Sequence, residues 1–307
     1  MTSQRVAAVD CGTNSIRLLV ADLDPETGEL RDLDRRMTIV RLGQGVDRTG
    51  RLAPEALERT FAACREYAAV IAGHGAERLR FVATSASRDA ENRDEFTAGV
   101  RDILGVEPEV ITGDEEAELS FAGATRELQG SADLVPPYLV FDLGGGSTEF
   151  VLGTDWVQAA RSVDIGCVRM TERHGGDVDA MRADIARALD LAARTVPLTG
   201  AATLVGLAGT VTTVAGIALE LSAYDSAAIH HSRIPLERVR EVTRMLLAAS
   251  PEERAAIPVM HPGRVDVIGA GALVLLAVME RTGARELVVS EHDILDGIAW
   301  SVAARAS

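Results

Sequence analysis

Residues 142–152 read DLGGGSTEFVL, and residues 10–20 read DCGTNSIRLLV. In both stretches an aspartate ends a short apolar run, a glycine follows two residues later and a serine five residues later. A second apolar run then begins, and two apolar runs joined by a Gly/Ser/Asn-rich turn predict a β-hairpin. The pattern recurs from residue 10 to residue 142, an offset of 132 residues, which predicts a duplicated domain.

The segments around these hairpins alternate between helical and extended patterns. Residues 54–71 carry apolar side chains at steps of three and four, which predicts a helix. Residues 80–83 and 110–111 are predicted strands, and a helix is predicted after the second. The uncharged run 195–219 predicts a buried strand, loop and helix, and the loop 129–137 is the predicted hinge or boundary. The predicted fold class is α/β.

The composition excludes several classes of protein. The chain has 307 residues with 46 acidic and 31 basic side chains, a formal charge of -15, which disfavours nucleic acid and anionic membranes as partners. All 31 basic residues are arginine, so a P-loop lysine and a Schiff-base lysine are both absent. The three cysteines lie far apart and no signal-peptide pattern is present, which predicts a reduced, cytoplasmic protein without disulfides.

The triple-glycine turn is the strongest local signal. Without Cβ atoms, the backbone amides of such a turn can converge on an anion, and the following hydroxyls add donors. Asp142, at the end of the preceding strand, can hold a cation such as Mg²⁺. The alternative is a plain hairpin turn with a capping aspartate. The candidate phosphate-binding residues here are Gly144, Gly145, Gly146, Ser147 and Thr148.

The first turn offers a similar set of donors. Its hydroxyl and amide side chains can donate to a phosphate, and Arg17 can donate two hydrogen bonds to it. The alternative is an Asx-type turn with Arg17 pointing to solvent. The candidate phosphate-binding residues of this turn are Gly12, Thr13, Asn14, Ser15 and Arg17.

Three further candidates lie next to predicted strands or helices. The stretch 205–216 predicts a strand, a loop and a helix, so the helix N-terminus at Gly206, Gly209 and Thr210 favours an anion. Arg88 and Arg264 lie in loops after a strand and before a helix, respectively. Either guanidinium can clamp a phosphate, or form a structural ion pair with a neighbouring aspartate.

Glu116 is the candidate general base. Thr112 and Glu115 have the spacing of a capping box, which gives Glu115 a structural role. Glu116 is not needed for the cap, and small residues lie near it on the same helical face, so it can orient and deprotonate a water molecule. The alternative is a solvated glutamate at a helix start. All six histidines are interpreted as structural.

The chain resembles the exopolyphosphatase/guanosine pentaphosphate phosphohydrolase (Ppx/GppA) family of the actin-like, sugar-kinase and Hsp70 superfamily. The resemblance implies two actin-like (ribonuclease H-like) domains flanking a cleft, at residues 1–127 and 128–295, with 296–307 packing back onto the first. Asp296 departs from the family pattern by replacing a positive charge, which predicts the loss of a basic contact there. The motifs that carry the resemblance are DCGTNSIRLLV (10–20), TSASRDA (84–90), ITGDEEAELSF (111–121), DLGGGSTEFVLG (142–153), GLAGT (206–210), MHPGRVDVIGAG (260–271) and SEHDILDGIAW (290–300).

The resemblance implies Mg²⁺-dependent hydrolysis of a terminal phosphoanhydride of inorganic polyphosphate. Glu116 would be the general base, Glu149 would help to hold the water or metal, and Asp142 and Asp10 would lie on the metal side. A homodimer is expected from the resemblance alone. Three alternative functions stay open from the sequence. They are a guanosine pentaphosphate (pppGpp) phosphohydrolase, a superfamily kinase, and a non-catalytic sensor of polyphosphate or an alarmone.

Overall fold

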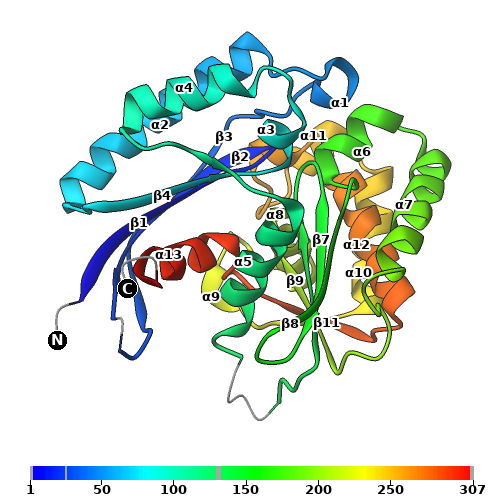
Figure 1. The fold of residues 1–307 in the computed structure, drawn as a ribbon. Helices are drawn as coiled ribbons and strands as arrows, with labels where there is room; N and C mark the ends of the chain where they lie inside the picture. Colours follow the sequence, from blue (N-terminus) through cyan, green and yellow to red (C-terminus); the bar gives the residue numbers. More distant parts are fainter. Residues whose placement is uncertain (1–2, 25, 129–132, 305–307) are drawn as a thin grey trace. The chain divides into compact units, whose positions relative to one another are not determined.

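The computed structural model describes residues 3–24, 26–128 and 133–304. The chain forms two compact units, one of Met1–Gly123 with Ile294–Ser307 and the other of Ala124–Asp293 (Figure 1). The domain boundaries expected from the sequence stay a prediction. The predicted boundary loop, 129–137, lies partly outside the described residues.

The first unit is built on one mixed sheet in the order β3-β2-β1-β4-β5. Strands β1, β2 and β3 pair antiparallel, whereas β1, β4 and β5 pair parallel. The strands are β1 (Gln4–Cys11), β2 (Ser15–Leu23), β3 (Leu30–Ile39), β4 (Arg78–Ala83) and β5 (Glu109–Val110). The helices are α1 (Val46–Thr49), α2 (Pro54–His74), α3 (Ser85–Asp89), α4 (Arg93–Leu104), α5 (Gly113–Thr125) and α13 (Ile294–Ala304).

Both faces of this sheet are buried, because alternate side chains of a strand point to opposite faces. Ala7 and Val9 of β1 join the apolar cluster formed with α2 and α4. Val6 and Ala8 join a second cluster that includes Ile298 of α13. Figure 1 shows α2 and α4 on one side of the sheet and α13 on the other. The C-terminal helix is therefore part of the core of the first unit.

The second unit is built on a sheet in the order β10-β11-β9-β6-β7-β8. Its strands are β6 (Tyr138–Leu143), β7 (Thr148–Gly153), β8 (Val157–Val163), β9 (Thr203–Leu207), β10 (Arg233–Pro235) and β11 (Glu286–Val289). Its helices are α6 (Cys167–His174), α7 (Val178–Ala193), α8 (Ala208–Ala218), α9 (Ser226–Ile229), α10 (Leu236–Ala248), α11 (Pro251–Ala255) and α12 (Ile268–Thr282), with a 3-10 turn at Pro262–Arg264.

The two sheets share one topology. In the second unit β8, β7 and β6 pair antiparallel, and β6, β9 and β11 pair parallel, which repeats the order β3-β2-β1-β4-β5 of the first unit. Asp10 is opposite Arg17 in the first hairpin, and Asp142 is opposite Glu149 in the second. The repeated hairpins therefore occupy equivalent places, as a duplicated domain predicts.

The uncharged run 195–219 contains β9 and all of α8, and both are largely buried, as predicted. The predicted loop between them is absent, because α8 begins at the residue after β9. Among the described residues, no helix is both long enough and apolar enough to cross a membrane.

Candidate phosphate-binding and catalytic site

The triple-glycine turn of the second unit is held from behind by helix α6. The amide of Gly144 donates to the carbonyl of Ser147 at 3.0 Å and closes the turn. The carbonyls of Gly144 and Gly145 accept from the first amides of α6, at Cys167 and Val168. Because these carbonyls point toward α6, the turn is anchored through its acceptors rather than its donors.

The donors of the turn remain available. No described residue accepts a hydrogen bond from the backbone amides of Gly145 and Gly146. Unpaired amides in a glycine turn form an anion-binding nest. The hydroxyl of Thr148 is fully buried and donates to the carbonyl of Ile165. This contact gives Thr148 a structural function, and its predicted phosphate contact stays a prediction.

Two carboxylates lie side by side behind this turn. Asp142, the second-to-last residue of β6, is directly opposite Glu149 on β7, and both side chains are buried. The hydroxyl of Ser162, on β8, donates to Oε1 of Glu149 at 2.7 Å. Two neighbouring carboxylates offer the hard oxygen ligands that Mg²⁺ prefers, so the residues present fit this ion.

The turn of the first unit repeats this construction. The amide of Gly12 donates to the carbonyl of Ser15 at 2.9 Å. Oγ of Thr13 lies 2.8 Å from Oγ of Ser85, and the buried Oδ1 of Asn14 has no hydrogen-bond partner among the described residues. These polar groups gather at the carboxyl ends of β1 and β4, where parallel strands place ligand-binding residues.

Arg17 and Asp10 form an ion pair across this hairpin. Nη2 of Arg17 lies 2.7 Å from Oδ2 of Asp10, and Nε lies 3.0 Å from the same oxygen. Arg17 therefore does not simply point to solvent. The predicted metal role of Asp10 stays a prediction, and Asp10 is engaged by a guanidinium in this structure.

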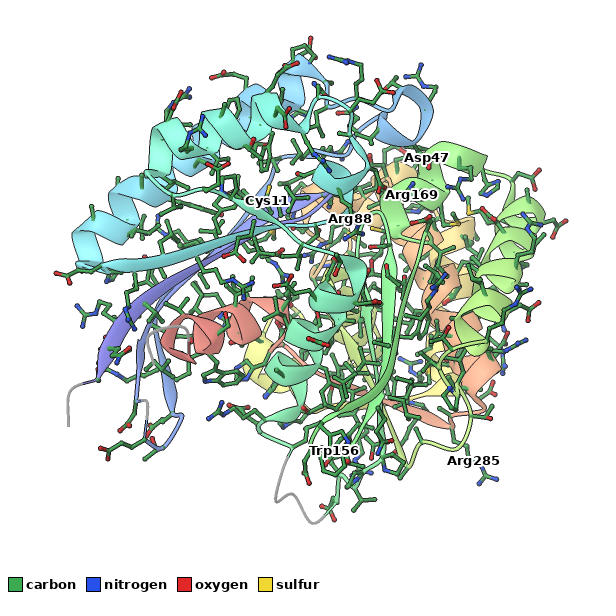
Figure 2. All side chains as sticks on the ribbon, in the orientation of Figure 1. Cys11, Asp47, Arg88, Trp156, Arg169 and Arg285 are labelled. Carbon is green, nitrogen blue, oxygen red and sulfur yellow. The ribbon has the colours of Figure 1, made fainter. Side chains whose placement is uncertain are left out.

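The two adjacent glutamates at the start of helix α5 pair with different arginines. Oγ1 of Thr112 accepts from the amide of Glu115 at 3.2 Å, as the capping pattern predicts, and the Glu115 carboxylate pairs with Arg80 at 2.7 Å. Glu116 is buried, and its Oε2 lies 3.0 Å from Nη1 of Arg88, a residue of α3 labelled in Figure 2. The candidate base and a candidate phosphate ligand are therefore in direct contact.

A guanidinium packs against the N-terminus of helix α8, which follows β9 directly. Nη1 of Arg264 donates to Oγ1 of Thr213 in α8 at 3.2 Å. A Cβ atom added to Gly209 would lie 2.0 Å from Nη2 of Arg264, so the missing side chain makes room for the guanidinium. Ala208 has a φ of 71°, a strained conformation of the kind often found at functional sites.

Gly206 has a packing role that the sequence did not indicate. It lies within β9, and an added Cβ would meet the ring of Phe141 at 2.8 Å and the side chains of Leu287 and Val211. Its predicted phosphate contact stays a prediction.

Sequence reasoning missed several polar residues that support this site. Nε of Arg169, labelled in Figure 2, donates to the carbonyl of Gly146 at 2.6 Å, and Ser162 holds Glu149. Arg80 is buried and bridges Glu109 and Glu115. These residues stand outside the motifs, and only the packing of distant strands and helices brings them next to the motif residues.

The cysteines take no part in this chemistry. All three are buried free thiols, and Cys11 is labelled in Figure 2. Burial raises the pKa of Cys11 and Cys167, and raises the pKa of Cys64 to about 12. The thiols therefore stay protonated near neutral pH and behave as small apolar side chains.

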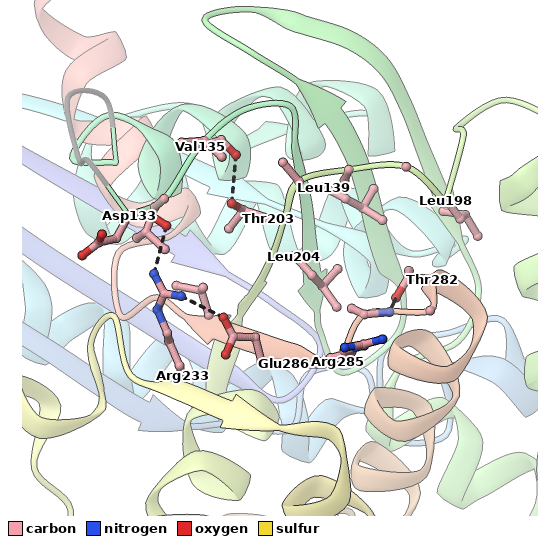
Figure 3. Close-up of a pocket in the computed structure, with 17 residues that line it drawn as sticks. Asp133, Val135, Leu139, Leu198, Thr203, Leu204, Arg233, Thr282, Arg285 and Glu286 are labelled. Atoms are coloured by element: carbon pink, nitrogen blue, oxygen red, sulfur yellow. Dashed lines mark hydrogen bonds and ion pairs between the residues drawn. The ribbon is translucent and has the colours of Figure 1, made fainter.

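A cavity of about 570 Å³ lies elsewhere in the second unit (Figure 3). It is lined by residues at the amino ends of β6, β9 and β11, whereas the glycine turn lies at the carboxyl end of β6. Arg233 crosses it, paired with Glu286 at 2.9 Å and with the carbonyl of Asp133. This cavity is therefore separate from the candidate phosphate site.

Each unit carries an equivalent glycine-containing turn and buried carboxylates on a duplicated α/β topology, a combination typical of proteins that handle phosphate groups. The chain belongs to the Ppx/GppA phosphatase family, whose model matches residues 19–306. It is 54% identical to exopolyphosphatase 2 of Mycobacterium tuberculosis, over 99% of this chain and all of that protein.

A second relative carries a different name. The chain is 28% identical to the guanosine-5'-triphosphate,3'-diphosphate pyrophosphatase of Aeromonas salmonicida, over 96% of this chain and 59% of that protein. The crystal structure of an exopolyphosphatase-like protein matches 99% of this chain and all of that chain with a TM-score of 0.93 and 45% identity. The predicted family and the predicted α/β fold class are thus confirmed.

Proposed function

We propose that this protein is an exopolyphosphatase that hydrolyses the terminal phosphoanhydride of inorganic polyphosphate and releases orthophosphate. The observation that carries the proposal is the glycine turn at 144–146, which has unpaired amides beside two buried carboxylates. A chain with a formal charge of -15 repels polyanions as a whole, so a polyphosphate must be bound through such local donors.

The chain's own residues supply binding and proton transfer. In the first unit the turn at 12–15 and Arg88 would hold phosphate oxygens, and in the second unit the turn at 144–148 and Arg264 would do so. Glu116 would take a proton from the attacking water through its carboxylate. In phosphoryl transfer, positioning and charge stabilisation supply most of the rate. The buried position of Glu116 keeps the base away from bulk solvent.

We propose Mg²⁺ as the cofactor, held by Asp142 and Glu149. Both are carboxylates, both are buried, and they face each other on adjacent strands. A bound Mg²⁺ would neutralise charge on the phosphate oxygens. Asp10 is a further candidate ligand, provided that Arg17 releases it.

The second candidate is hydrolysis of pppGpp, a reaction suggested by the name of the Aeromonas relative. Both substrates end in a phosphoanhydride, so the same turns and the same base would serve either. Phosphate release should be measured from long-chain polyphosphate and from pppGpp at equal Mg²⁺ concentrations. We expect a higher kcat/KM with polyphosphate, and the opposite order would favour the second candidate.

A binding measurement and an assay with an added acceptor distinguish a hydrolase from a sensor and from a kinase. Tight binding of polyphosphate without turnover would indicate a sensor, and transfer of phosphate to an added small-molecule acceptor would indicate a kinase. We further propose a cytoplasmic location and a homodimer. The described cysteines are free thiols, as expected in a reducing compartment. Light scattering of the purified protein would test the dimer.

A further inference from the structure

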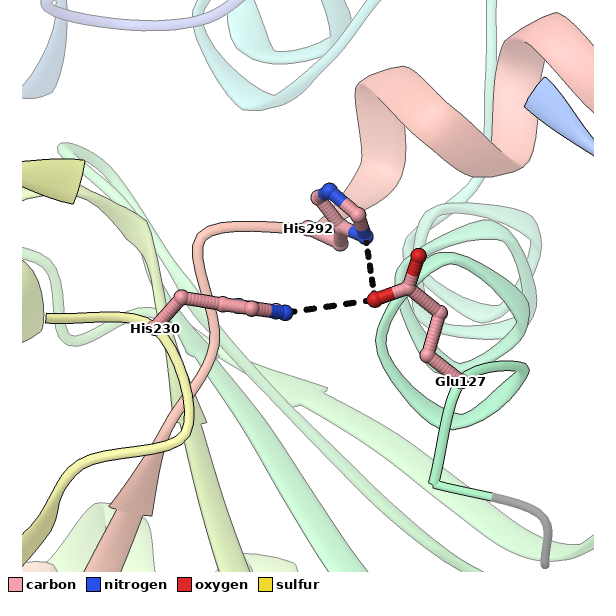
Figure 4. Close-up of side chains that lie close together, drawn as sticks. All are labelled: Glu127, His230 and His292. Carbon is pink, nitrogen blue, oxygen red and sulfur yellow. Dashed lines mark hydrogen bonds and ion pairs between the residues drawn. The ribbon is translucent and has the colours of Figure 1, made fainter. Parts of the chain in front are cut away.

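Three side chains from separate segments of the second unit converge on one point. Glu127 follows α5, His230 follows α9, and His292 lies between β11 and α13 (Figure 4). Oε2 of Glu127 lies 3.2 Å from Nε2 of His230 and 3.2 Å from Nδ1 of His292. The three residues are far apart in the sequence, so no local pattern indicates that they meet.

Hydrogen bonding accounts for only part of this arrangement. His230 forms a hydrogen bond with Glu127, but the buried Nδ1 of His292 has no hydrogen-bond partner among the described residues. The Nδ1 atom of His292 is near the carboxylate oxygen without the geometry of a hydrogen bond. A buried polar atom without a hydrogen-bond partner requires an explanation, and one explanation is a bound ion.

The spacing of the three ligand atoms suits a transition metal. Zn²⁺ binds nitrogen and carboxylate oxygen at about 2.0–2.2 Å, so two ligand atoms of a tetrahedral site lie roughly 3.2–3.6 Å apart. Both distances from Glu127 Oε2 are 3.2 Å, at the short end of that range. All three ligand atoms also lie within 4.8 Å of one another.

We propose that Glu127, His230 and His292 form a binding site for a late first-row divalent metal ion of the Zn²⁺ type. Two imidazoles and one carboxylate leave a fourth position for water. Imidazole ligands favour such ions, whereas Mg²⁺ prefers an all-oxygen shell, so the site is chemically distinct from the carboxylate pair Asp142 and Glu149.

Binding requires one rearrangement. The backbone amide of Glu291 donates to Nδ1 of His230 at 3.1 Å, so in this structure the ring carries its proton on Nε2, facing Glu127. A metal ion on Nε2 requires the proton on Nδ1, because a metal-bound histidine donates through its other nitrogen. The Glu291 amide must then turn away from the ring.

This rearrangement connects the metal site to helix α8. The Glu291 carboxylate accepts a hydrogen bond from the hydroxyl of Tyr224 at 2.6 Å, and that hydroxyl lies 2.9 Å from Oγ1 of Thr212. Thr212 belongs to α8, whose N-terminus is a candidate phosphate-binding element. Metal binding would therefore change a contact close to that N-terminus.

The test uses the full-length chain after EDTA treatment and dialysis, titrated with ZnCl₂ in a calorimeter. We expect one saturable site, retained in the presence of excess MgCl₂. Glu127→Gln and His292→Asn should each weaken binding at least tenfold. His74→Gln changes a histidine of the first unit, paired with Asp34, and should bind like the unmodified chain.

A second readout follows the ring of His230. Long-range ¹H–¹⁵N spectra should show its proton on Nε2 without Zn²⁺ and on Nδ1 with Zn²⁺. Melting curves identify any variant that fails to fold, and Glu127→Gln keeps the shape of the side chain it replaces. The proposal is overturned if no saturable Zn²⁺ binding occurs, if both folded variants bind as tightly as the unmodified chain, or if the tautomer of His230 does not change.

Discussion

Arg88 and Glu116 form an ion pair, with Nη1 of the guanidinium 3.0 Å from Oε2 of the carboxylate. In the proposed mechanism Arg88 binds phosphate and Glu116 removes a proton from water. A phosphate that attracts Arg88 would weaken its hold on Glu116 and leave a carboxylate lone pair for the water. Substrate binding would thus prepare the base.

Glu116→Gln should abolish most of the activity. The amide keeps the size of the side chain and can accept from Arg88, but it cannot take the proton of the attacking water. Loss of a general base costs on the order of 10²–10⁴ in rate, about 3–5 kcal/mol of barrier. Single-turnover phosphate release measures the rate, and substrate binding should survive.

Glu115→Gln is the matched control on the same helix. Glu115 is half exposed and pairs with Arg80 rather than Arg88, so the rate should remain near that of the unmodified chain. Melting curves of both variants report folding. Full activity of Glu116→Gln would show that α5 does not supply the general base.

Asp142→Asn should raise the Mg²⁺ concentration needed for half-maximal activity. The substitution removes one negative charge from the carboxylate pair while keeping the shape of the side chain in β6. Phosphate release measured across a Mg²⁺ titration gives the shift, and circular dichroism reports folding. An unchanged titration curve would exclude Asp142 as a metal ligand.

Gly209→Ala should displace Arg264 without unfolding the chain. The new Cβ would lie 2.0 Å from Nη2 of Arg264, the mobile end of a long side chain, so the guanidinium would move away. We expect KM to rise by about one order of magnitude, about 1.4 kcal/mol. Gly216→Ala, in the same helix, meets Val259 at 3.4 Å and serves as control.

A double variant separates this effect from a general disturbance of α8. In an Arg264→Ala background, Gly209→Ala should add little, because the group it displaces is already absent. Additive effects of the two changes would contradict the proposed role of Gly209.

The thiols should resist alkylation in the native protein at pH 8 and react in denaturant. Burial raises the pKa of Cys64 to about 12, above the usual value of about 8.5 for an unfolded chain. Protonated thiols therefore contribute to stability below about pH 8.5, and this contribution is lost as the pH rises toward 12. Mass spectrometry after iodoacetamide treatment measures the labelling, and rapid native labelling of Cys64 would contradict its burial.

Gly297→Ala should destabilise the first unit. An added Cβ in α13 would lie 2.1 Å from the carbonyl oxygen of Leu119 in α5, so backbone must shift. Such overpacking costs about 1–3 kcal/mol. Gly73→Ala, in α2, has nothing within 4 Å and should stabilise the chain by about 0.5–1 kcal/mol. Thermal melts of both variants should therefore shift in opposite directions.

The sequence predicted local structure well because the hairpins carry their own turn chemistry. The repeated Asp, Gly and Ser at 10–15 and 142–147 indicated two equivalent hairpins, and the two sheets share one topology. The spacing of Thr112 and Glu115 also predicted the start of α5. Each of these signals depends on residues within a few positions of one another.

Contacts between distant segments could not be predicted in this way. Residues 127, 230 and 292 are about 60 to 165 positions apart in the sequence, and only the fold brings them together. Because Asp296 replaces a positive charge of the family pattern, the sequence predicts that a basic contact is lost there. In the structure, Oδ1 of Asp296 lies 2.5 Å from Nη2 of Arg35 in β3. Arg35 lies 261 positions from Asp296 in the sequence, so no local pattern predicts that its positive charge is near this carboxylate.

The place of α13 has a consequence for synthesis on the ribosome. Helix α13 supplies Ile294, Leu295 and Ile298 to the apolar cluster that also contains Val6 and Val82. The first unit therefore lacks part of its interior until this helix has left the exit tunnel. The second unit is one continuous segment, so a chain whose translation has stopped before residue 294 contains all of the second unit and only part of the first. The first unit, whose N-terminal segment is synthesised first, is thus the unit whose apolar core is completed last.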